Sequence, residues 1–159
     1  MVYLVRHAHA GSKAEWDGPD RVRPLSETGR RQAAGLLAQL RRYPIHRILS
    51  SPTDRCRQTV QPLASALRLP VEETDALSVD AAADGVLELL ADPGHRHAVL
   101  CTHGELIGRV FDRLIDDGLR LPDRPHWPKG STWVLERHGG DRVAEASYLE
   151  PLVPHASPG

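Results

Sequence analysis

The chain has 159 residues, of which 40% are hydrophobic and 26% charged, a composition typical of one soluble globular domain. The formal net charge of −1 lacks the basic excess that a nucleic-acid-binding surface needs. No apolar run approaches the roughly 20 residues that span a bilayer. Two cysteines, Cys56 and Cys101, are too few for a disulfide scaffold. We therefore expect a single soluble domain with no nucleic acid and no membrane among its partners.

The first residues and the cysteines also bear on location and assembly. Residues 1–7 have no basic segment ahead of an apolar one, so we expect no signal peptide. Reduced thiols at Cys56 and Cys101 would favour the cytoplasm. We expect a monomer or a weak dimer, although no sequence pattern fixes the oligomeric state.

Apolar runs alternate along the chain with helix-like patterns. Strands are predicted at residues 2–5, 45–49, 70–73 and 98–101, followed by a hairpin of residues 132–135 and 142–148 that turns at residues 138–141. Helices are predicted at residues 26–42, 52–67, 81–90 and 105–115, with capping residues at Ser26 and Thr28 and with Pro52 in a first turn. The Gly- and Pro-containing segments 11–24 and 119–130 are predicted loops.

This alternation of strand and helix predicts an α/β fold, a three-layer α/β/α sandwich around a mostly parallel sheet. We expect residues 1–150 to form one domain and residues 151–159 to form a flexible tail. Ligands of such sheets bind beyond the carboxyl ends of the strands. Residues with catalytic chemistry are therefore expected just after Val5, Leu49 and Cys101.

Arginine and histidine occur at these three predicted strand ends. Arg6 and His7 follow the first strand, Arg55 follows the second and His103 follows the strand that ends at Cys101. Arginine forks bind phosphate oxygens in pairs. A neutral imidazole can attack phosphorus, and a second histidine can donate to the transferring group. The sequence thus predicts phosphoryl transfer by positioning and electrostatics, with no metal or other cofactor required.

Three short motifs resemble those of the histidine phosphatase superfamily, whose fold is phosphoglycerate mutase-like. They are Leu4-Val5-Arg6-His7-Ala8, Ser50-Ser51-Pro52-x-x-Arg55-x-x-x-Thr59 and Thr102-His103-Gly104. The resemblance runs from residue 2 to about residue 149. The small size and Arg23-Pro24-Leu25-Ser26-x-x-Gly29 are similar to the SixA-like branch of phosphohistidine phosphatases. The segment Lys129-Gly130-Ser131-Thr132-Trp133-Val134-Leu135 is also similar to the phosphatase half of Nudix–phosphatase proteins.

The resemblance implies a role for each conserved motif position. His7 would accept the phosphoryl group and form a covalent phosphohistidine. The residues that would complete the phosphate pocket are Arg6, Arg55 and His103. Further contacts with substrate are expected from His9, Arg23, Thr102 and Gly104. No metal site is implied, and the substrate would be a phosphorylated small molecule or a phosphohistidine protein.

The proton donor for the leaving group is the one departure from the family pattern. The family's acidic position falls near Val79, so Asp80 is a displaced candidate. Asp17, Asp20 and Glu105 are alternatives that the sequence does not rank. A good leaving group, such as the imidazole of phosphohistidine, needs less acid help than an alkoxide.

Other functions could use some of the same residues. His7 and His9 could form a metal-binding pair, but no third ligand has recognisable spacing and Arg6 would oppose a cation. A cysteine phosphatase is excluded because neither Cys56 nor Cys101 has an arginine at the required spacing. The alternatives that stay open are a nucleotide-directed phosphatase and a non-catalytic phosphate-binding regulatory module.

Overall fold

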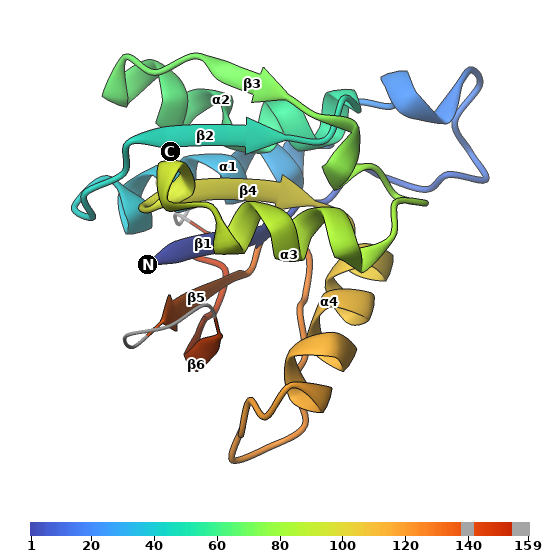
Figure 1. The fold of residues 1–159 in the computed structure, drawn as a ribbon. Helices are drawn as coiled ribbons and strands as arrows, with labels where there is room; N and C mark the ends of the chain where they lie inside the picture. Colours follow the sequence, from blue (N-terminus) through green and yellow to red (C-terminus); the bar gives the residue numbers. More distant parts are fainter. Residues whose placement is uncertain (138–141, 154–159) are drawn as a thin grey trace.

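The computed structural model describes residues 1–137 and 142–153. In this part of the chain a six-stranded sheet has the order β3-β2-β4-β1-β5-β6 (Figure 1). The strands are β1 (Val2–Arg6), β2 (Arg47–Ser50), β3 (Val71–Glu73), β4 (Ala98–Thr102), β5 (Thr132–Arg137) and β6 (Val143–Leu149). The predicted strands are all present, with β3 at an edge of the sheet.

The pairing of the strands sets the position of the site. β3, β2, β4 and β1 pair in parallel, whereas β5 and β6 are antiparallel additions. Arg6 at the end of β1 lies opposite Thr102, and Ser50 at the end of β2 lies opposite Cys101. The carboxyl ends of β1, β2 and β4 therefore lie side by side, at the end of the sheet where these parallel strands finish.

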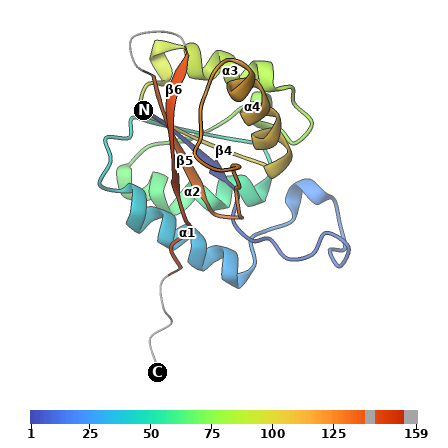
Figure 2. The same ribbon diagram turned by 90° about the horizontal axis from the view of Figure 1, so that it is seen from below.

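Helices cover both faces of the sheet and make the predicted three-layer sandwich. They are α1 (Glu27–Leu40), α2 (Asp54–Leu67), α3 (Ala83–Ala91) and α4 (Gly104–Asp116). α1 and α2 lie on one face, and α3 and α4 lie on the other (Figure 2). The connecting segments contain three short 3-10 helices: η1 (Asp20–Val22), η2 (Asp75–Leu77) and η3 (Pro93–His95).

Alternation along β1 divides the core between the two faces. Tyr3 and Val5 pack into the cluster beneath α1 and α2, whereas Leu4 packs into the cluster beneath α3 and α4. All three side chains are fully buried. β1 is thus anchored on both faces, which makes its carboxyl end a rigid support.

Among the described residues, none of the helices has the length and apolar character that crossing a membrane would require.

The N-terminus of α1 is fixed against the segment that follows β1. The Ser26 side chain caps the helix by accepting from the Gly29 amide, and the Ser26 amide donates to the His9 carbonyl oxygen. A Cβ atom on Gly29 would lie 1.9 Å from that oxygen. Glycine is required here because any side chain would push α1 away from the residues after β1.

The start of α2 differs from the prediction. Pro52 was expected in the first helical turn, but α2 begins at Asp54 with Thr53 as its N-cap residue. The Ser51 amide still donates to the Cys101 carbonyl oxygen, 3.0 Å away, so strand-like bonding extends past β2. Residues 52 and 53 are needed to turn the chain before the helix can begin.

Three further expectations concern connecting segments. The loop of residues 11–24 contains η1, which the sequence did not predict. The hairpin turn at residues 138–141 and most of the expected tail, residues 154–159, lie outside the described residues. Residues 151–153 follow β6 without regular secondary structure.

Candidate active site

His7 lies at the carboxyl end of β1 and is held by backbone bonds on both sides. Its amide donates to the Thr102 carbonyl oxygen at 2.9 Å, and its carbonyl oxygen accepts from the Gly130 amide at 3.1 Å. The side chain is largely buried, with the residue 7% exposed. The sheet therefore fixes the backbone from which the imidazole projects.

The ring of His7 has one nitrogen engaged and the other available. Nδ1 lies 2.8 Å from the Ala8 carbonyl oxygen, which can only accept, so Nδ1 carries the proton and donates. Nε2 is then the nitrogen with the free lone pair. Burial lowers the pKa of His7 from 6.5 to about 4. The imidazole is therefore neutral at physiological pH, which is the nucleophilic state.

Two arginines bring buried donors to the same edge of the sheet. Arg55, in the first turn of α2, is 4% exposed, and its Nε has no hydrogen-bond partner among the described residues. The Nε of Arg6 is likewise buried and unpartnered within that part of the chain, although Arg6 Nη1 donates to the Trp127 carbonyl oxygen at 2.9 Å. Buried donors without acceptors are costly, so this arrangement suits a bound anion.

His103 lies beside His7 and is held by a residue that the sequence did not single out. The two ring centroids are 5.4 Å apart, and His103 is fully buried. Its Nε2 lies 2.9 Å from Ser51 Oγ, and its Nδ1 lies 3.5 Å from Arg55 Nη2. Ser51 was part of a recognised motif, but only the folded structure shows that its hydroxyl orients His103.

Gly104, the first residue of α4, leaves room for Arg6. A Cβ atom at this position would lie 2.8 Å from the Arg6 Cζ. The guanidinium thus lies against the N-terminus of α4, where a side chain on residue 104 would displace it. This close approach explains the glycine without assigning it a direct contact with substrate.

The remaining predicted binding residues are engaged within the protein. Thr102 is fully buried, and its hydroxyl donates to the Leu77 carbonyl oxygen at 2.6 Å. His9 Nδ1 lies 2.6 Å from Ser26 Oγ. Arg23 Nε donates to Asp20 Oδ1 at 3.1 Å. The structure thus shows His9 in contact with Ser26 and Arg23 in contact with Asp20, whereas the Thr102 hydroxyl holds η2.

The four candidate proton donors differ in their surroundings. Asp17 and Asp80 are exposed. Partial burial tends to raise the pKa of Asp20, but Arg55 and Arg23 outweigh it and the pKa is lowered. The pKa of Glu105 is also lowered, first by a bond to its own backbone and then by His103 and Arg6. Asp20 and Glu105 are therefore ionised at neutral pH, which is the wrong state for an acid.

Lys129 is a cation near the site. Its sequence pattern indicated no catalytic or binding role for its side chain. Its carbonyl oxygen accepts from Gln32 Nε2, and the next residue, Gly130, donates to the carbonyl oxygens of Arg6 and His7. Partial burial, with the charges of Arg6 and other arginines, lowers the pKa of Lys129. Its position near the arginines could not be predicted from the sequence, because the conformation of a proline-rich loop is not readable from spacing.

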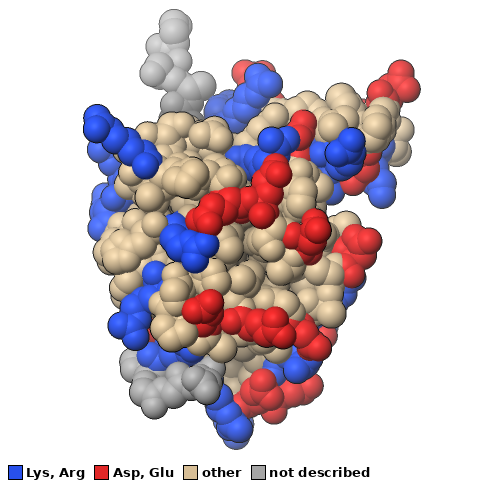
Figure 3. All heavy atoms as spheres, turned by 45° about the horizontal axis from the view of Figure 1, so that its top comes forward, with Lys and Arg blue, Asp and Glu red and all other residues tan. Residues whose placement is uncertain are grey.

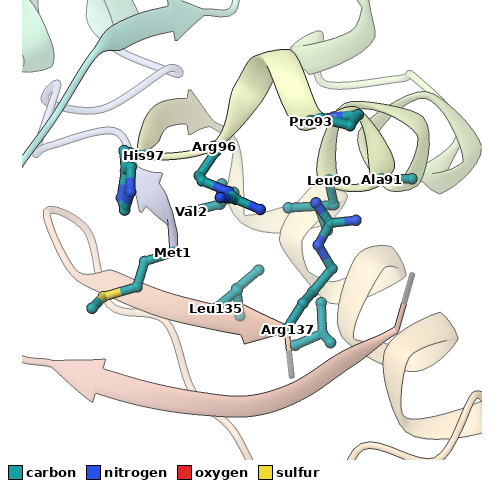
Figure 4. Close-up of a pocket in the computed structure, with 10 residues that line it drawn as sticks. Met1, Val2, Leu90, Ala91, Pro93, Arg96, His97, Leu135 and Arg137 are labelled. Carbon is teal, nitrogen blue, oxygen red and sulfur yellow. The ribbon is translucent and has the colours of Figure 1, made fainter. Parts of the chain in front are cut away.

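A cavity and mixed surface charge also occur away from these residues. A cavity of about 600 Å³ lies at the opposite end of the sheet, where Met1, Arg96, His97 and Arg137 are among its lining residues (Figure 4). Acidic and basic side chains are both spread over the face seen in Figure 3. The described residues contain no group of three or more His, Cys, Asp or Glu side chains suited to a metal ion.

Comparisons with known sequences identify relatives. A model of the histidine phosphatase superfamily (branch 1) matches residues 2–78. The 8-oxo-(d)GTP phosphatase of Mycolicibacterium smegmatis (strain ATCC 700084 / mc(2)155) is 36% identical over 157 residues, which cover 94% of this chain and 48% of the relative. The chain thus spans about half the length of this curated relative.

Solved structures of similar fold cover nearly the whole chain. A candidate phosphohistidine phosphatase SixA from Agrobacterium tumefaciens is 30% identical with a TM-score of 0.72, over 94% of this chain and 97% of that one. A SixA protein from Nakamurella multipartitia is 26% identical with a TM-score of 0.73, over 95% of each chain. A protein histidine phosphatase SixA complexed with tungstate has a TM-score of 0.71 at 21% identity, over 96% of each chain.

The buried, neutral state of His7 predicts an effect on stability. Between about pH 6.5 and pH 4 the unfolded chain binds a proton that folded His7 does not, so the free energy of unfolding falls as the pH falls through this range. The lowered pKa corresponds to a loss of roughly 3 kcal/mol. In urea unfolding at pH 7 and pH 4, His7→Gln should lose less stability on acidification than wild type.

The exposed His126 provides the control for this measurement. His126→Gln is the matched substitution, because it also removes one imidazole but at an exposed position. An equally steep loss of stability in His7→Gln and in wild type would show that burial does not suppress protonation of His7.

Proposed function

Because the chain belongs to the histidine phosphatase superfamily, we propose that it is a metal-independent phosphatase acting through a covalent phosphohistidine at His7. The observation that carries the proposal is the state of the His7 ring. Nδ1 donates to the Ala8 carbonyl oxygen and burial keeps the ring neutral, so Nε2 is a nucleophile at physiological pH.

The first step transfers the phosphoryl group to the enzyme. His7 Nε2 attacks phosphorus, a P–N bond forms, and the bond between phosphorus and the leaving group breaks. The two arginines, Arg6 and Arg55, neutralise the phosphoryl oxygens with donors that are otherwise buried without partners. His103 lies beside His7, with 5.4 Å between the ring centroids, and its contact with Arg55 Nη2 places it next to the same oxygens.

The second step returns the enzyme to its starting state. A water oxygen attacks the phosphorus of phosphohistidine, the P–N bond breaks, and inorganic phosphate leaves. His7 regains its neutral form with Nδ1 still bonded to the Ala8 carbonyl oxygen. The backbone bond therefore holds one tautomer through both steps.

The leaving groups that suit this site are those that depart without a proton. Asp20 and Glu105 are ionised, and Asp17 and Asp80 are exposed. We propose that the substrate is a protein phosphohistidine or a small phosphate compound with a good leaving group. The SixA relatives, described as phosphohistidine phosphatases, support the first class.

A nucleotide-directed phosphatase is the second candidate. The relative named 8-oxo-(d)GTP phosphatase supports it, and so does Lys129, a further cation beside the arginines of the site. The terminal phosphate of a nucleoside triphosphate would occupy the Arg6 and Arg55 pocket, and Lys129 would contact the next phosphate. The nucleoside diphosphate that departs is itself a good leaving group, so this substrate also fits a site without a poised acid.

The proposal also covers the cellular location and the oligomeric state of the protein. Cys56 and Cys101 are free and buried, which fits a reducing compartment such as the cytoplasm. We propose that the protein works there as a monomer or weak dimer. A non-catalytic phosphate-binding module is disfavoured, because binding alone does not require a neutral histidine beside the buried arginines.

Turnover of an aryl phosphate tests the function. His7→Ala should reduce kcat/KM for p-nitrophenyl phosphate by at least about 1,000-fold, since the nucleophile is removed. Wild-type activity should persist in excess EDTA. Substantial activity in folded His7→Ala would exclude His7 as the nucleophile, and loss of wild-type activity in EDTA would exclude the metal-independent mechanism.

Lys129 separates the two substrate classes. If the substrate is a nucleoside triphosphate, Lys129→Met should raise the KM for GTP about 10-fold, because one charge-assisted contact is lost. The KM for p-nitrophenyl phosphate should change by less than about 3-fold. Lys13→Met is the matched control, because Lys13 is the other lysine of the chain and is exposed. Equal effects of Lys129→Met on both substrates would count against the nucleotide-directed function.

A further inference from the structure

Asp20 connects the loop of residues 11–24 to the phosphate-binding arginine. It is the first residue of η1, and its carboxylate lies between two guanidinium groups. Oδ2 accepts from Arg55 Nη2 at 3.0 Å, and Oδ1 accepts from Arg23 Nε at 3.1 Å. The backbone carbonyl oxygen of Asp20 also accepts from Arg55 Nη1 at 2.9 Å. One residue thus supplies two acceptors to Arg55 and one to Arg23.

The bonds to Asp20 occupy one edge of the Arg55 guanidinium and leave another free. A guanidinium can bind an oxyanion through its end, Nη1 with Nη2, or through its side, Nε with Nη2. Asp20 takes the end edge with its carbonyl and carboxylate oxygens. On the side edge, Nε is buried without a partner in the described part of the chain, and Nη2 lies 3.5 Å from His103 Nδ1. The side edge therefore faces His103 and keeps one donor, Nε, without a partner among the described residues.

Arg23 binds the other oxygen of the Asp20 carboxylate and is itself held by backbone carbonyl oxygens. Arg23 is 8% exposed, and its Nη1 donates to the Ala10 carbonyl oxygen at 2.8 Å and to the Gly11 carbonyl oxygen at 3.2 Å. Those two residues follow His9 on the segment that leaves β1. Contacts therefore run from this segment through Arg23 and Asp20 to Arg55. They connect the loop of residues 11–24 to the first turn of α2.

We propose that Asp20 is a positioning residue, which holds the end edge of Arg55 so that the side edge, Nε and Nη2, is presented to the phosphoryl oxygens beside His7 and His103. This inference rests on the proposed phosphatase function and adds a role for an acidic residue outside the three sequence motifs. Asp20 acts through Arg55 and does not contact the reacting atoms.

Two other roles for Asp20 make different predictions. As a proton donor it would matter most for substrates with poor leaving groups, but its two arginine partners stabilise the ionised carboxylate. As an internal anion that substrate must displace, its removal would strengthen phosphate binding. As a positioning residue, its removal should weaken binding and turnover for every leaving group alike.

The test compares Asp20→Asn, Asp20→Glu and Asp17→Asn with wild type in the full chain. Asp17 is the matched control because it lies on the same loop and is exposed. The substrates are p-nitrophenyl phosphate and phenyl phosphate, which differ in leaving group, and the inhibitor is tungstate as a phosphate mimic. Thermal unfolding of each variant reports whether the fold is retained.

For a positioning residue, Asp20→Asn should lower kcat/KM for both aryl phosphates by the same factor, about 10- to 100-fold. Tungstate inhibition should weaken by a similar factor, since Arg55 no longer presents its side edge. Asp20→Glu should recover part of the loss, and Asp17→Asn should match wild type. If Asp20→Asn does not fold, Asp20→Glu decides, because it keeps the charge and moves only its position.

Three results would overturn the proposal. A loss confined to phenyl phosphate would assign Asp20 as the proton donor. Tighter tungstate binding or faster turnover in Asp20→Asn would make Asp20 a displaceable anion. Unchanged kinetics in Asp20→Asn would show that Arg55 needs no positioning. Absence of phosphatase activity in wild type would instead refute the proposed function, which keeps the two failures distinct.

Discussion

The hydrogen bond from His7 Nδ1 to the Ala8 carbonyl oxygen is the contact on which the chemistry depends. It is 2.8 Å long and fixes the tautomer that leaves Nε2 free. Burial of the ring then keeps it neutral, with a pKa of about 4. Neither effect suffices alone. An exposed ring would be partly protonated, and a ring without this hydrogen bond could carry its proton on Nε2, the nitrogen that would attack phosphorus. Together they give His7 the neutral ring and the free Nε2 that the proposed mechanism requires of its nucleophile.

The parallel sheet brings the partners of His7 to the same place. Arg6 follows from β1, Arg55 from the turn after β2, and His103 from the end of β4, because parallel strands end at one edge. Each partner is then held by a contact of its own: Trp127 for Arg6, Asp20 for Arg55 and Ser51 for His103. The strands supply proximity, and these second contacts supply orientation.

Sequence patterns predicted the strands and the helices, because apolar periodicity is a local signal. They also predicted that Arg6, His7, Arg55 and His103 come together beyond the strand ends, and the structure brings them together there. They missed the start of α2, where the Ser51 amide remains bonded to Cys101 and delays the helix past Pro52. They also gave no role to Ser51 or Lys129 and left Asp20 unranked among four acids. The contact of Ser51 with His103, and the proposed roles of Lys129 and Asp20, depend on segments distant in sequence, which spacing along the chain does not encode.

Detection of phosphate on His7 would test the central claim most directly. Wild-type protein mixed briefly with an activated aryl phosphate, then quenched in base, should carry one phosphoryl group on the peptide that contains His7. The group should be lost in acid, as expected of a P–N bond, and His7→Ala should carry none. A wild-type protein that hydrolyses the aryl phosphate but carries the phosphoryl group on another residue would contradict the account.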